Sequence, residues 1–535
     1  MESAYLLALL FSIIGGLAAS MLRLPPLIGF LGAGFAVSAT GLHEIPFIDA
    51  IAELGVTTLL FTIGLKLNPR EITSPRIAGS ALGHAATNAI IFAGLFAVVG
   101  ALPLRELAGL DITALAYIGV AASFSSTIFV MSQLEENNRN GSSVGRIALG
   151  VLVLQDIISV AVLVFASGKT PEPWALGLPF LLLLRPLFTR LPDRIFRTEV
   201  LVLTGVGIAV AAYSLFELAG ISGSLGSLVA GLILSGHPLS DRMFDALVSV
   251  RELLLVAFFI QIGLGGLPDA GGFLIAGVLV AFLVVKAWLF IVILHRCGMS
   301  ARTSALTGLT LANYSEFGLL IMSVAVANGV LPPSWLSIMA IAVAGSFVAG
   351  SLVSAREEPI LRFIKHWIKP RPEHKLAPDE RKVKVTAADA IVLGMGRVGE
   401  GAYRRLHNEY GMNVYGVEFD EDRIEFLRTH GYNIIAGDAA DPELWRRVEF
   451  DQNPEVYVIA LPSRKCTIDV VEGIRRRRGD NVTIAGTALN EAAQETFLQT
   501  GADVAVNVYA GAGEEIADKA FKALQAATPS PDAQR

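Results

Sequence analysis

The sequence carries little charge and very little cysteine. Only 17% of its 535 residues are charged and 53% are hydrophobic, whereas soluble domains have about a quarter charged residues. This composition excludes an ordinary soluble protein and predicts an integral membrane protein. Two cysteines, Cys297 and Cys466, are too few for a disulfide framework and fit a reducing cytosolic environment. The net charge of −6 gives no reason to expect a nucleic-acid partner.

The first residues lack the features of a cleaved secretory signal. MESAYLLALL has no basic segment and no small-residue cleavage site, so we expect it to begin the first span. Apolar runs long enough to cross a bilayer predict about thirteen spans between Ala4 and Ser354, and the segment 173–219 leaves that count open by one. The distribution of arginine and lysine over the loops places the N-terminus outside and the C-terminal half in the cytoplasm.

Two pairs of similar segments predict an inverted repeat. LLFTIGLKL (59–67) is similar to AFFIQIGLG (257–265), and ASFSSTIFV (122–130) is similar to ANYSEFGLL (312–320). Chance similarity between apolar segments is the alternative, but two pairs at similar spacing favour the repeat. Because each pair is separated by an odd number of predicted spans, its members cross in opposite directions. This pattern is typical of transporters that bind their substrate near the membrane midplane.

Polar residues inside the predicted spans mark the candidate ion site. Asp156 follows Gln155 at the middle of the apolar run 145–168, where an ionised group is costly and usually functional. SFSST and NYSEF place hydroxyl groups where they can compensate two interrupted helices, although such groups also serve as contacts between packed helices. The candidate ion-site residues are Gln155, Asp156, Lys286 and Glu316, with Ser123, Ser125, Ser126, Thr127, Asn313 and Ser315 on the crossing helices.

The charged residues of this set have expected partners. Lys286 lies well inside an apolar run, so we expect it to pair with an acid, either Asp156 or Glu316. Glu316 could neutralise the positive N-terminal ends of the half-helices, and free carbonyl groups could ligate a cation. The buried polar residues His84, Asn88 and Glu217 are expected to make helix-packing contacts only.

The last third of the chain predicts a cytoplasmic α/β domain. After the membrane part (1–355), residues 356–386 are basic and proline-rich and are expected to lie as a linker against the inner leaflet lipid. Residues 387–510 contain a strand, a G-x-G-x-x-G turn, a helix and a later strand ending in an acid, which predicts a Rossmann-like nucleotide-binding fold. Residues 511–535 are expected to form a helix and a polar tail.

The glycines of this motif let phosphate groups approach the helix N-terminus, and the distal acid can bind ribose hydroxyls. The predicted nucleotide-binding residues are Gly394, Met395, Gly396, Arg397, Val398, Gly399, Glu418, Phe419, Asp438 and Ala439.

These motifs carry a family resemblance over nearly the whole chain. VLVLQDIISV, LLFTIGLKL, the SFSST and NYSEFG pair and AFFIQIGL, in this order, resemble the Kef-type potassium efflux systems among the cation/proton antiporters. The resemblance implies K⁺/H⁺ exchange at Asp156, with Gln155 contributing a neutral oxygen to K⁺. It also implies an elevator-like motion, a homodimer in a bacterial inner membrane and an ancillary cytoplasmic subunit.

The C-terminal domain resembles the potassium-transport nucleotide-binding domain, which binds AMP or NAD(H). Residues 437–439 match its Gly-Asp-Ala element, expected near the adenosine. The segment 483–497 departs from glutathione-gated members because it contains no arginine. The loop 236–252 aligns with the family's cytoplasmic regulatory loop, and its Asp241 and Asp245 either contact the nucleotide domain or are solvated.

Three other function classes are weighed against this interpretation. A ligand-gated potassium channel should carry a filter sequence such as TVGYG, which is not present. A membrane oxidoreductase should carry a redox centre beside the Rossmann fold, and the sequence shows none, so we expect no enzyme activity. A sodium/proton antiporter of the same fold is the third alternative.

Overall fold

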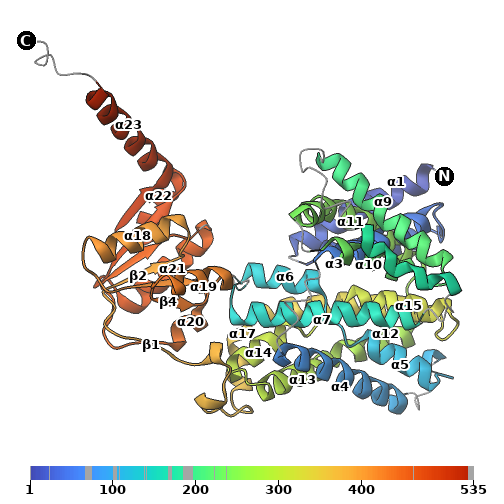
Figure 1. Ribbon diagram of the computed structural model, residues 1–535. Coiled ribbons are helices and arrows are strands. Elements are labelled where there is room, and N and C mark those ends of the chain that lie inside the picture. The colour runs from blue at the N-terminus through green and yellow to red at the C-terminus, as the bar shows by residue number, and fades with distance from the viewer. Residues whose placement is uncertain are drawn as a thin grey trace, which may run out of the picture. The chain divides into compact units, whose positions relative to one another are not determined.

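The computed structural model describes residues 2–527 except 23, 67–74, 100–104, 108, 138, 140, 167–171, 185–196, 222, 236–237 and 462. It divides into two units, one formed by Met1–Gln133 and Ile147–Pro370 and the other by Leu134–Arg146 and Arg371–Arg535. The first is the helical unit and the second contains the parallel sheet (Figure 1).

The helical unit consists of apolar helices in chain order. They are α1 (Glu2–Met21), α2 (Pro26–Ala39), α3 (Ile48–Lys66), α4 (Pro75–Val99), α5 (Ile112–Ala121), α6 (Thr127–Glu136), α7 (Ser143–Ala166), α9 (Thr198–Leu218), α10 (Gly223–Leu234), α11 (Pro238–Leu264), α12 (Ala270–Ala281), α13 (Leu283–Arg296), α14 (Ala301–Thr310), α15 (Glu316–Ala327), α16 (Ser334–Ala355) and α17 (Glu357–Ile364), with 3₁₀ helices η2 (Arg105–Leu107) and η3 (Pro173–Leu184).

Eight stretches of the described helices are long and apolar enough to cross a membrane, and four more apolar helices are shorter. The prediction of a polytopic helical membrane domain is confirmed, whereas the number thirteen stays a prediction. Two predicted irregular segments are partly helical. From Pro238 onward, the segment expected to be the loop 236–252 is the first part of helix α11. The segment expected to be the linker 356–386 contains α17. The predicted contact between Asp241 or Asp245 and the nucleotide domain stays a prediction.

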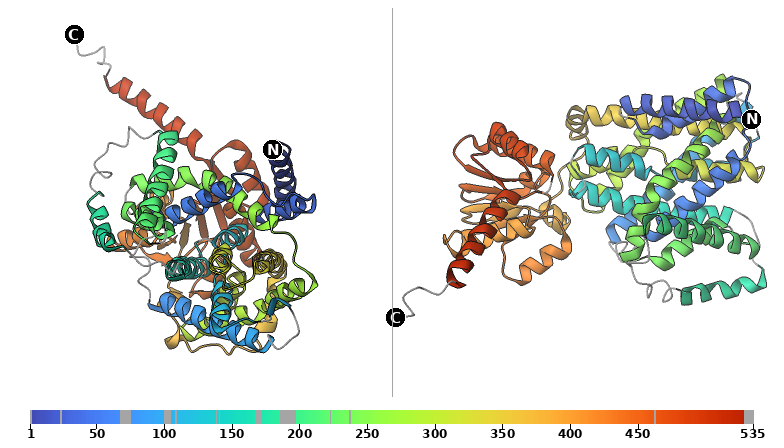
Figure 2. Two further views of the ribbon diagram at one scale, coloured as in Figure 1. Left: turned by 90° about the vertical axis from the view of Figure 1, so that its right-hand side faces the viewer. Right: turned by 90° about the horizontal axis from the view of Figure 1, so that it is seen from above.

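The helices form two bundles. In the first, α3 packs extensively against α10 and α11, while α2 packs against α1 and α11, and α9 against α10. In the second, α4 packs against α5 and α13, and α16 packs against α12 and α15. We call these the scaffold bundle and the core bundle; Figure 2 shows the same helices from two further directions. The broken helices and α7 lie with the core bundle.

Matching glycines support the inverted repeat within the scaffold bundle. A Cβ atom on Gly64 of α3 would lie 2.9 Å from the Cα of Gly231 of α10. A Cβ atom on Gly263 of α11 would lie 2.6 Å from the Cα of Gly34 of α2. The two crossings bring backbones into direct contact, as small residues do in membrane helices. Gly64 and Gly263 are each the glycine of the Ile-Gly-Leu triplet that LLFTIGLKL and AFFIQIGLG share, so the two predicted repeats make equivalent contacts.

The second unit contains a six-stranded parallel sheet in the order β4-β3-β2-β6-β7-β8, with β1 and β5 paired separately. The strands are β1 (Val383–Val385), β2 (Ala390–Leu393), β3 (Val414–Glu418), β4 (Ile434–Ala436), β5 (Val448–Phe450), β6 (Val456–Ile459), β7 (Thr483–Ala488) and β8 (Val504–Asn507). The helices are α18 (Arg397–Asn408), α19 (Glu421–Thr429), α20 (Pro442–Arg447), α21 (Arg464–Arg478), α22 (Glu491–Thr500) and α23 (Val508–Ala527).

This topology confirms the predicted Rossmann-like fold. All four residues of β2 are buried because the strand lies between β3 and β6 at the sheet centre. The chain runs outward from β2 to β4 on one side and from β6 to β8 on the other. Ligands of such sheets bind at the carboxyl ends of the strands where the order reverses, which here is the end of β2.

Candidate functional site

Two interrupted helices cross in the core bundle, as predicted. The break between α5 and α6 spans 122–126, and the break between α14 and α15 spans 311–315. The hydroxyl of Ser125 donates to the carbonyl of Leu311 at 2.7 Å. The backbone N–H of Ser126 donates to Oδ1 of Asn313 at 2.7 Å. The two breaks are therefore bonded directly to each other.

Short polar side chains explain why the helices stop here. Ser126 Oγ accepts from the backbone N–H of Phe129 at 3.3 Å, and Ser315 Oγ accepts from that of Phe317 at 3.1 Å. These hydroxyls satisfy N–H groups that a new helix leaves without partners. The predicted role of the serines in compensating the breaks agrees with this geometry.

Lys286 satisfies the carbonyl groups of both breaks. Its side chain is fully buried, and Nζ donates to the carbonyls of Phe124 and Asn313 at 2.7 Å each and of Ala122 at 3.2 Å. Neither predicted acid is among these partners, so the expected pairing with Asp156 or Glu316 is not what the structure shows. The physical reason is that the ends of α5 and α14 present negative carbonyl dipoles, which attract a buried cation.

Asp156 lies beside the first residue of α6. It lies at the middle of α7, is 9% exposed and accepts a hydrogen bond at Oδ2 from the hydroxyl of Thr127 at 3.2 Å. It makes no ion pair with any described residue. Thr127 begins α6, so the carboxylate lies at the positive end of that half-helix.

Gln155 hydrogen-bonds to the backbone of the first break. Its Oε1 accepts from the backbone N–H of Ser125 at 3.0 Å, and its Nε2 donates to the carbonyl of Ser123 at 3.4 Å. The sequence predicted that this oxygen contributes to K⁺ coordination. In the structure, one of its two acceptor positions is already used to hold the backbone. Coordination by the other position stays a prediction.

Glu316 lies at the boundary between the two bundles, and Arg251 is near enough to interact with it electrostatically. Glu316 is the first residue of α15 and lines a small apolar void with Leu59 of α3 and Leu255 of α11. Its Oε2 accepts no hydrogen bond from the described residues. Arg251 of α11 donates from one terminal nitrogen to Thr62 Oγ1 at 3.3 Å, while its Nε likewise has no described partner.

Sequence reasoning missed Arg251 because it was assigned to a loop. The helix begins at Pro238, so Arg251 lies within α11 and its side chain is only 11% exposed. The available signal was the apolar run that starts at Leu253, directly after Arg251 and Glu252. Asn88 was also missed, since its Nδ2 donates to the carbonyl of Ala122 and to Ser123 Oγ, both at 3.3 Å.

The other two polar residues make packing contacts, as expected. The ring of His84 stacks on Phe290 with 3.3 Å between centroids. Glu217 Oε1 accepts from the backbone N–H of Gly223 at 3.0 Å and so ties α9 to α10.

The glycine loop of the second unit has the geometry that phosphate binding requires. Gly394 has φ +89°, and a Cβ atom on Gly399 would lie 1.8 Å from the Gly394 carbonyl oxygen, so both positions exclude larger residues. A Cβ atom on Gly396 would meet no atom within 4 Å, which leaves open space before the N-terminus of α18. These are the turn, the helix packing and the phosphate approach of a dinucleotide motif. Arg397 and Val398 form the first turn of α18.

Glu418 holds the loop from the end of β3. Its Oε2 accepts from the N–H of Met395 at 3.1 Å, and its Oε1 accepts from those of Phe419 and Asp420 at 2.8 and 3.1 Å. The side chain is buried. Oε2 is thus bonded to the phosphate loop and Oε1 to the segment that follows β3, so Glu418 links the predicted ribose position to the phosphate loop.

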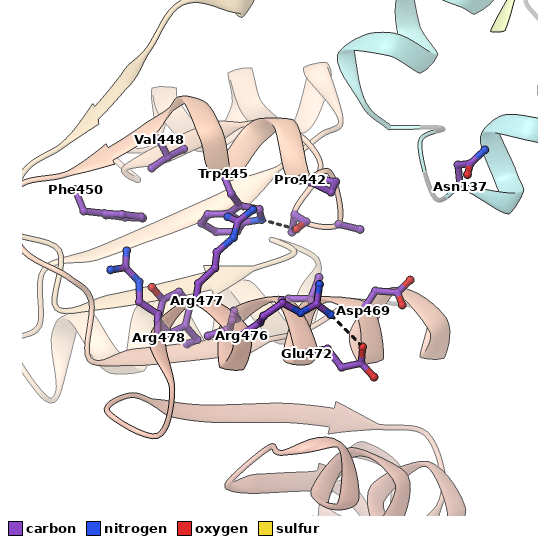
Figure 3. A pocket seen from close by; sticks show the side chains of 16 residues that line it. Asn137, Pro442, Trp445, Val448, Phe450, Asp469, Glu472, Arg476, Arg477 and Arg478 are labelled. Carbon is purple, nitrogen blue, oxygen red and sulfur yellow. Dashed lines mark hydrogen bonds and ion pairs between the residues drawn. The ribbon is translucent and has the colours of Figure 1, made fainter. Parts of the chain in front are cut away.

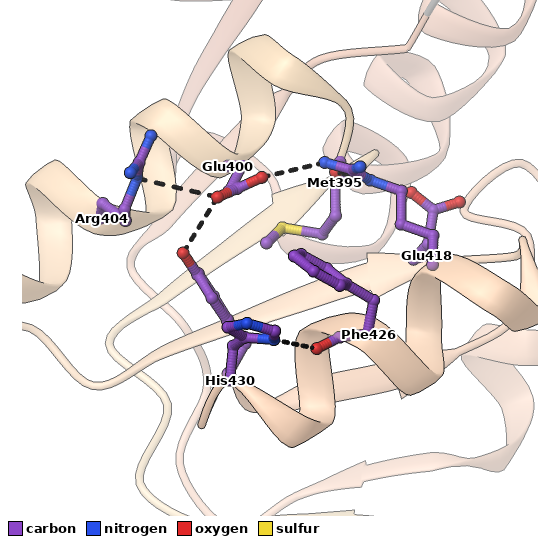
Figure 4. A network of polar contacts seen from close by, with 8 residues as sticks. Met395, Glu400, Arg404, Glu418, Phe426 and His430 are labelled. Carbon is purple, nitrogen blue, oxygen red and sulfur yellow. Dashed lines mark hydrogen bonds and ion pairs between the residues drawn. The ribbon is translucent and has the colours of Figure 1, made fainter.

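Residues around Glu400 fix α18 against α19. Arg423 donates to Glu400 Oε2 at 3.0 Å and also to the Met395 carbonyl, while Tyr432 OH donates to Glu400 Oε1 at 3.1 Å (Figure 4). Through the Met395 carbonyl, this network also restricts the motion of the glycine loop.

Asp438 and Ala439 follow β4 beside the same edge of the sheet. Asp438 Oδ1 accepts from the Ala440 N–H at 2.9 Å, and burial raises the pKa of its carboxyl while that bond partly opposes the rise. The Ala439 carbonyl accepts from the indole N–H of Trp445 at 2.8 Å. Both lie close to the carboxyl ends of the strands, where the sequence predicted the adenosine.

Comparisons with known proteins agree with both units. Residues 6–355 match the model of the family described as "Sodium/hydrogen exchanger, transmembrane". The chain belongs to this family. Residues 390–508 of the chain match the TrkA-N domain. The predicted resemblance to cation/proton antiporters with a nucleotide-binding domain is therefore confirmed.

Similar curated proteins include potassium transporters. The exchanger is 28% identical to the glutathione-regulated potassium-efflux system protein KefC of Salmonella schwarzengrund, covering 79% of this chain and 69% of the relative. It is 28% identical to the chloroplastic K(+) efflux antiporter 2 of Arabidopsis thaliana, covering 80% of this chain and 38% of the relative. A solved structure, the TrkA-N domain of the inner membrane protein ybaL from Escherichia coli, is 20% identical with a TM-score of 0.21, covering 26% of this chain and 97% of that chain.

Proposed function

We propose that this exchanger is a K⁺/H⁺ antiporter that binds its two ions alternately at Asp156. The observation that carries the proposal is the separation of Lys286 from that carboxylate. Lys286 is engaged by three carbonyls of the helix breaks, while Asp156 accepts one hydroxyl bond and has no ion pair with a described residue. A carboxylate without a cationic partner can hold a proton or a metal cation.

A single carboxylate explains coupled exchange. Asp156 cannot hold a proton and a K⁺ ion at the same time, so the two ions compete for one site. Exchange of one proton for one K⁺ then moves no net charge. Thr127 Oγ1, which lies 3.2 Å from the carboxylate, supplies an oxygen of the kind that hard cations accept.

Potassium is the proposed cation because the similar proteins named above are potassium efflux systems. Gln155 differs from an acid in adding no second charge beside Asp156. A sodium/proton antiporter of the same fold is the second candidate, supported by the family description. The two candidates differ only in the cation that the carboxylate accepts.

Alternating access is proposed to move the core bundle against the scaffold bundle. The glycine contacts of Gly34 with Gly263 and of Gly64 with Gly231 hold the scaffold bundle together at backbone distance. Apolar side chains and the small void beside Glu316 separate it from the core bundle. The homodimer, the bacterial inner membrane and the ancillary cytoplasmic subunit stay predictions from the resemblance.

Regulation is proposed to come from an adenine nucleotide on the cytoplasmic domain. The open space before α18 and the buried acid at the end of β3 fit a dinucleotide or mononucleotide. The residues that would hold it are Gly396 and Glu418, with Ala439 near the base. The nucleotide supplies no chemistry to transport; its binding energy would bias the domain between two conformations.

Transport by the purified protein in proteoliposomes tests the proposal. Asp156→Asn is expected to abolish K⁺/H⁺ exchange, measured as K⁺-induced dequenching of a pH-sensitive dye inside the vesicles. Asp269→Asn is the matched control, because Asp269 caps α12 by accepting from the Gly272 N–H at 2.8 Å and asparagine can cap equally well.

Exchange retained by Asp156→Asn would refute the site. Equal Na⁺ and K⁺ responses of the native chain, with Rb⁺ as a third cation, would favour the sodium/proton alternative over K⁺ selectivity. A response that depends on an imposed membrane potential would contradict one-for-one exchange.

A further inference from the structure

A pocket of about 430 Å³ lies in the nucleotide-binding unit, away from the glycine loop (Figure 3). It is bounded by α20, the strand β5 and the second half of α21. Neither the glycines of the phosphate loop nor Glu418 lines it. Of the residues assigned to the nucleotide site, Ala439 borders this pocket, whereas the residues of the phosphate and ribose positions do not.

One wall of the pocket is strongly basic. The C-terminal part of α21 carries four consecutive arginines, Arg475–Arg478. Arg475 has a structural role, because it donates to the carbonyls of Gly501 and Val482 and pairs with Asp503 at 2.6 Å. Cations at a helix C-terminus are stabilising in general, and all four arginines lie in the last turn of α21.

The remaining three arginines line the pocket. Arg476 lies 3.6 Å from Glu472, which partly compensates its charge. Arg477 and Arg478 form no ion pair with any described residue. Partial burial, together with the charges of Arg446, Arg478 and Arg476, lowers the pKa of Arg477. The arrangement keeps several positive charges close together, and a bound anion would offset the repulsion between them.

The opposite wall is apolar and aromatic. Its side chains include Trp445, Val448 and Phe450. Figure 3 shows Arg477 and Arg478 extending from α21 toward Trp445 and Phe450. The guanidinium of Arg478 lies 5.8 Å from the centroid of the Phe450 ring, a cation–π distance. A few charged groups set into an apolar cavity are typical of a small-molecule site.

We propose that this pocket binds a small organic anion, a phosphate ester or carboxylate carried on an aromatic or aliphatic body. Arg477 and Arg478 bind the anionic group, since guanidinium groups match phosphate and carboxylate geometry. Trp445 and Phe450 pack against the body. The site is separate from the glycine loop and makes the cytoplasmic domain a receptor for two ligands.

The pocket is linked to the nucleotide site through Ala439, which lines the pocket, and through the Trp445 side chain bonded to it. The indole of Trp445 packs in the pocket wall and donates its N–H to the Ala439 carbonyl at 2.8 Å. Ala439 belongs to the Gly-Asp-Ala element that follows β4. A ligand that moves the indole therefore acts directly on the segment expected beside the adenosine.

Fluorine NMR of the full chain tests the proposal. The five tryptophans are labelled with 5-fluorotryptophan, and the resonance of Trp445 is assigned with Trp445→Phe. Phenyl phosphate is titrated as the probe, with benzoate as the carboxylate probe. We expect a saturable shift of the Trp445 resonance and at least a tenfold weaker response in Arg477→Gln/Arg478→Gln.

The control variant is Arg405→Gln, which removes one arginine charge, as Arg477→Gln does, at an exposed position of α18. It should respond as the native chain does, as should the native chain in saturating AMP. The single variant Arg477→Gln gives an intermediate response if the double variant loses its fold.

Four results would overturn the proposal. They are no shift of Trp445 with either probe, an unchanged response of the arginine variants, an equal response to inorganic phosphate, and competition between phenyl phosphate and AMP. The last would place the probe in the glycine loop. Failure of transport at Asp156 would leave this experiment unaffected, because it measures the cytoplasmic domain alone.

Discussion

Replacing Lys286 by glutamine removes the buried cation that joins the two interrupted helices. Nζ makes three hydrogen bonds to main-chain carbonyls, two of them at 2.7 Å and one at 3.2 Å. Glutamine has a shorter side chain and two neutral donors, so it can replace at most two of these bonds and none of the charge. The change therefore tests whether Lys286 holds the crossing together electrostatically.

The expected loss of stability follows from the charges involved. Each half-helix end carries roughly half a negative charge, so the ends of α5 and α14 together resemble one buried anion. Removing one partner of a buried pair costs about 3–5 kcal/mol. Neutral N–H donors would recover part of this, which leaves an expected loss of about 2–4 kcal/mol. A purely polar contact between membrane helices would cost only about 0.6 kcal/mol per bond.

The assay is the free energy of unfolding of the purified chain in bicelles, titrated with dodecyl sulfate. Lys365→Gln, at an exposed lysine of the same unit, is the matched control and should change stability little. Transport in proteoliposomes is measured in parallel. Because Lys286 is not bonded to Asp156, the pH of half-maximal exchange should be unchanged in the fraction that remains folded.

Two results would refute this reasoning. A loss below about 1 kcal/mol would show that the helix ends do not depend on the ammonium. A large shift of the pH of half-maximal exchange would show that Lys286 acts on Asp156 during transport.

Three further predictions concern other parts of the chain. Gly396→Asp fills the open space before α18 with a negative charge, so AMP should no longer raise the melting temperature of the cytoplasmic domain; a retained shift would place the phosphate elsewhere. Burial raises the pKa of Asp441 to about 6 from its usual 3.8, so the stability present below pH 3.8 should fall by about 3 kcal/mol as pH rises through 6. Hydrogen exchange of α20 should show this fall in the native chain and not in Asp441→Asn, and an equal fall in both would contradict the assignment. Gly64→Ala should cost about 1–3 kcal/mol by overpacking, while Gly79→Ala, which meets no atom within 4 Å, should not; equal costs would contradict the crossing.

Composition and local pattern were sufficient for the fold class. Apolar runs predict membrane helices because the backbone in lipid must satisfy its own hydrogen bonds within the segment. The G-x-G-x-x-G motif predicts its loop because a larger residue at these positions would clash with backbone only a few residues away or adopt an unfavourable φ. Gly399 and Gly394 show these two cases. The repeat of LLFTIGLKL in AFFIQIGLG predicted two equivalent halves, and the structure shows that its glycines lie where close backbone contact permits only small residues.

Partners of buried charges could not be predicted in the same way. The sequence places Lys286, Asp156 and Glu316 at membrane depth, but it does not give the distances between helices. The end of the predicted loop was also misjudged, because a helix that continues beyond its apolar part, as α11 does around Arg251, has no local stop signal.

The sequence by itself determined that this chain is a membrane exchanger with a nucleotide-binding domain and that Asp156 is its candidate ion-binding acid. Only the tertiary structure decided that Lys286 donates to carbonyl groups at the helix breaks and that Gln155 hydrogen-bonds to the backbone of the first break. It also decided that three arginines of α21 line a second pocket. The physical reason is the distance along the chain over which each kind of signal acts. Hydropathy and glycine spacing act between residues that are close in the chain, whereas the partner of a buried charge is selected among groups that folding alone brings together.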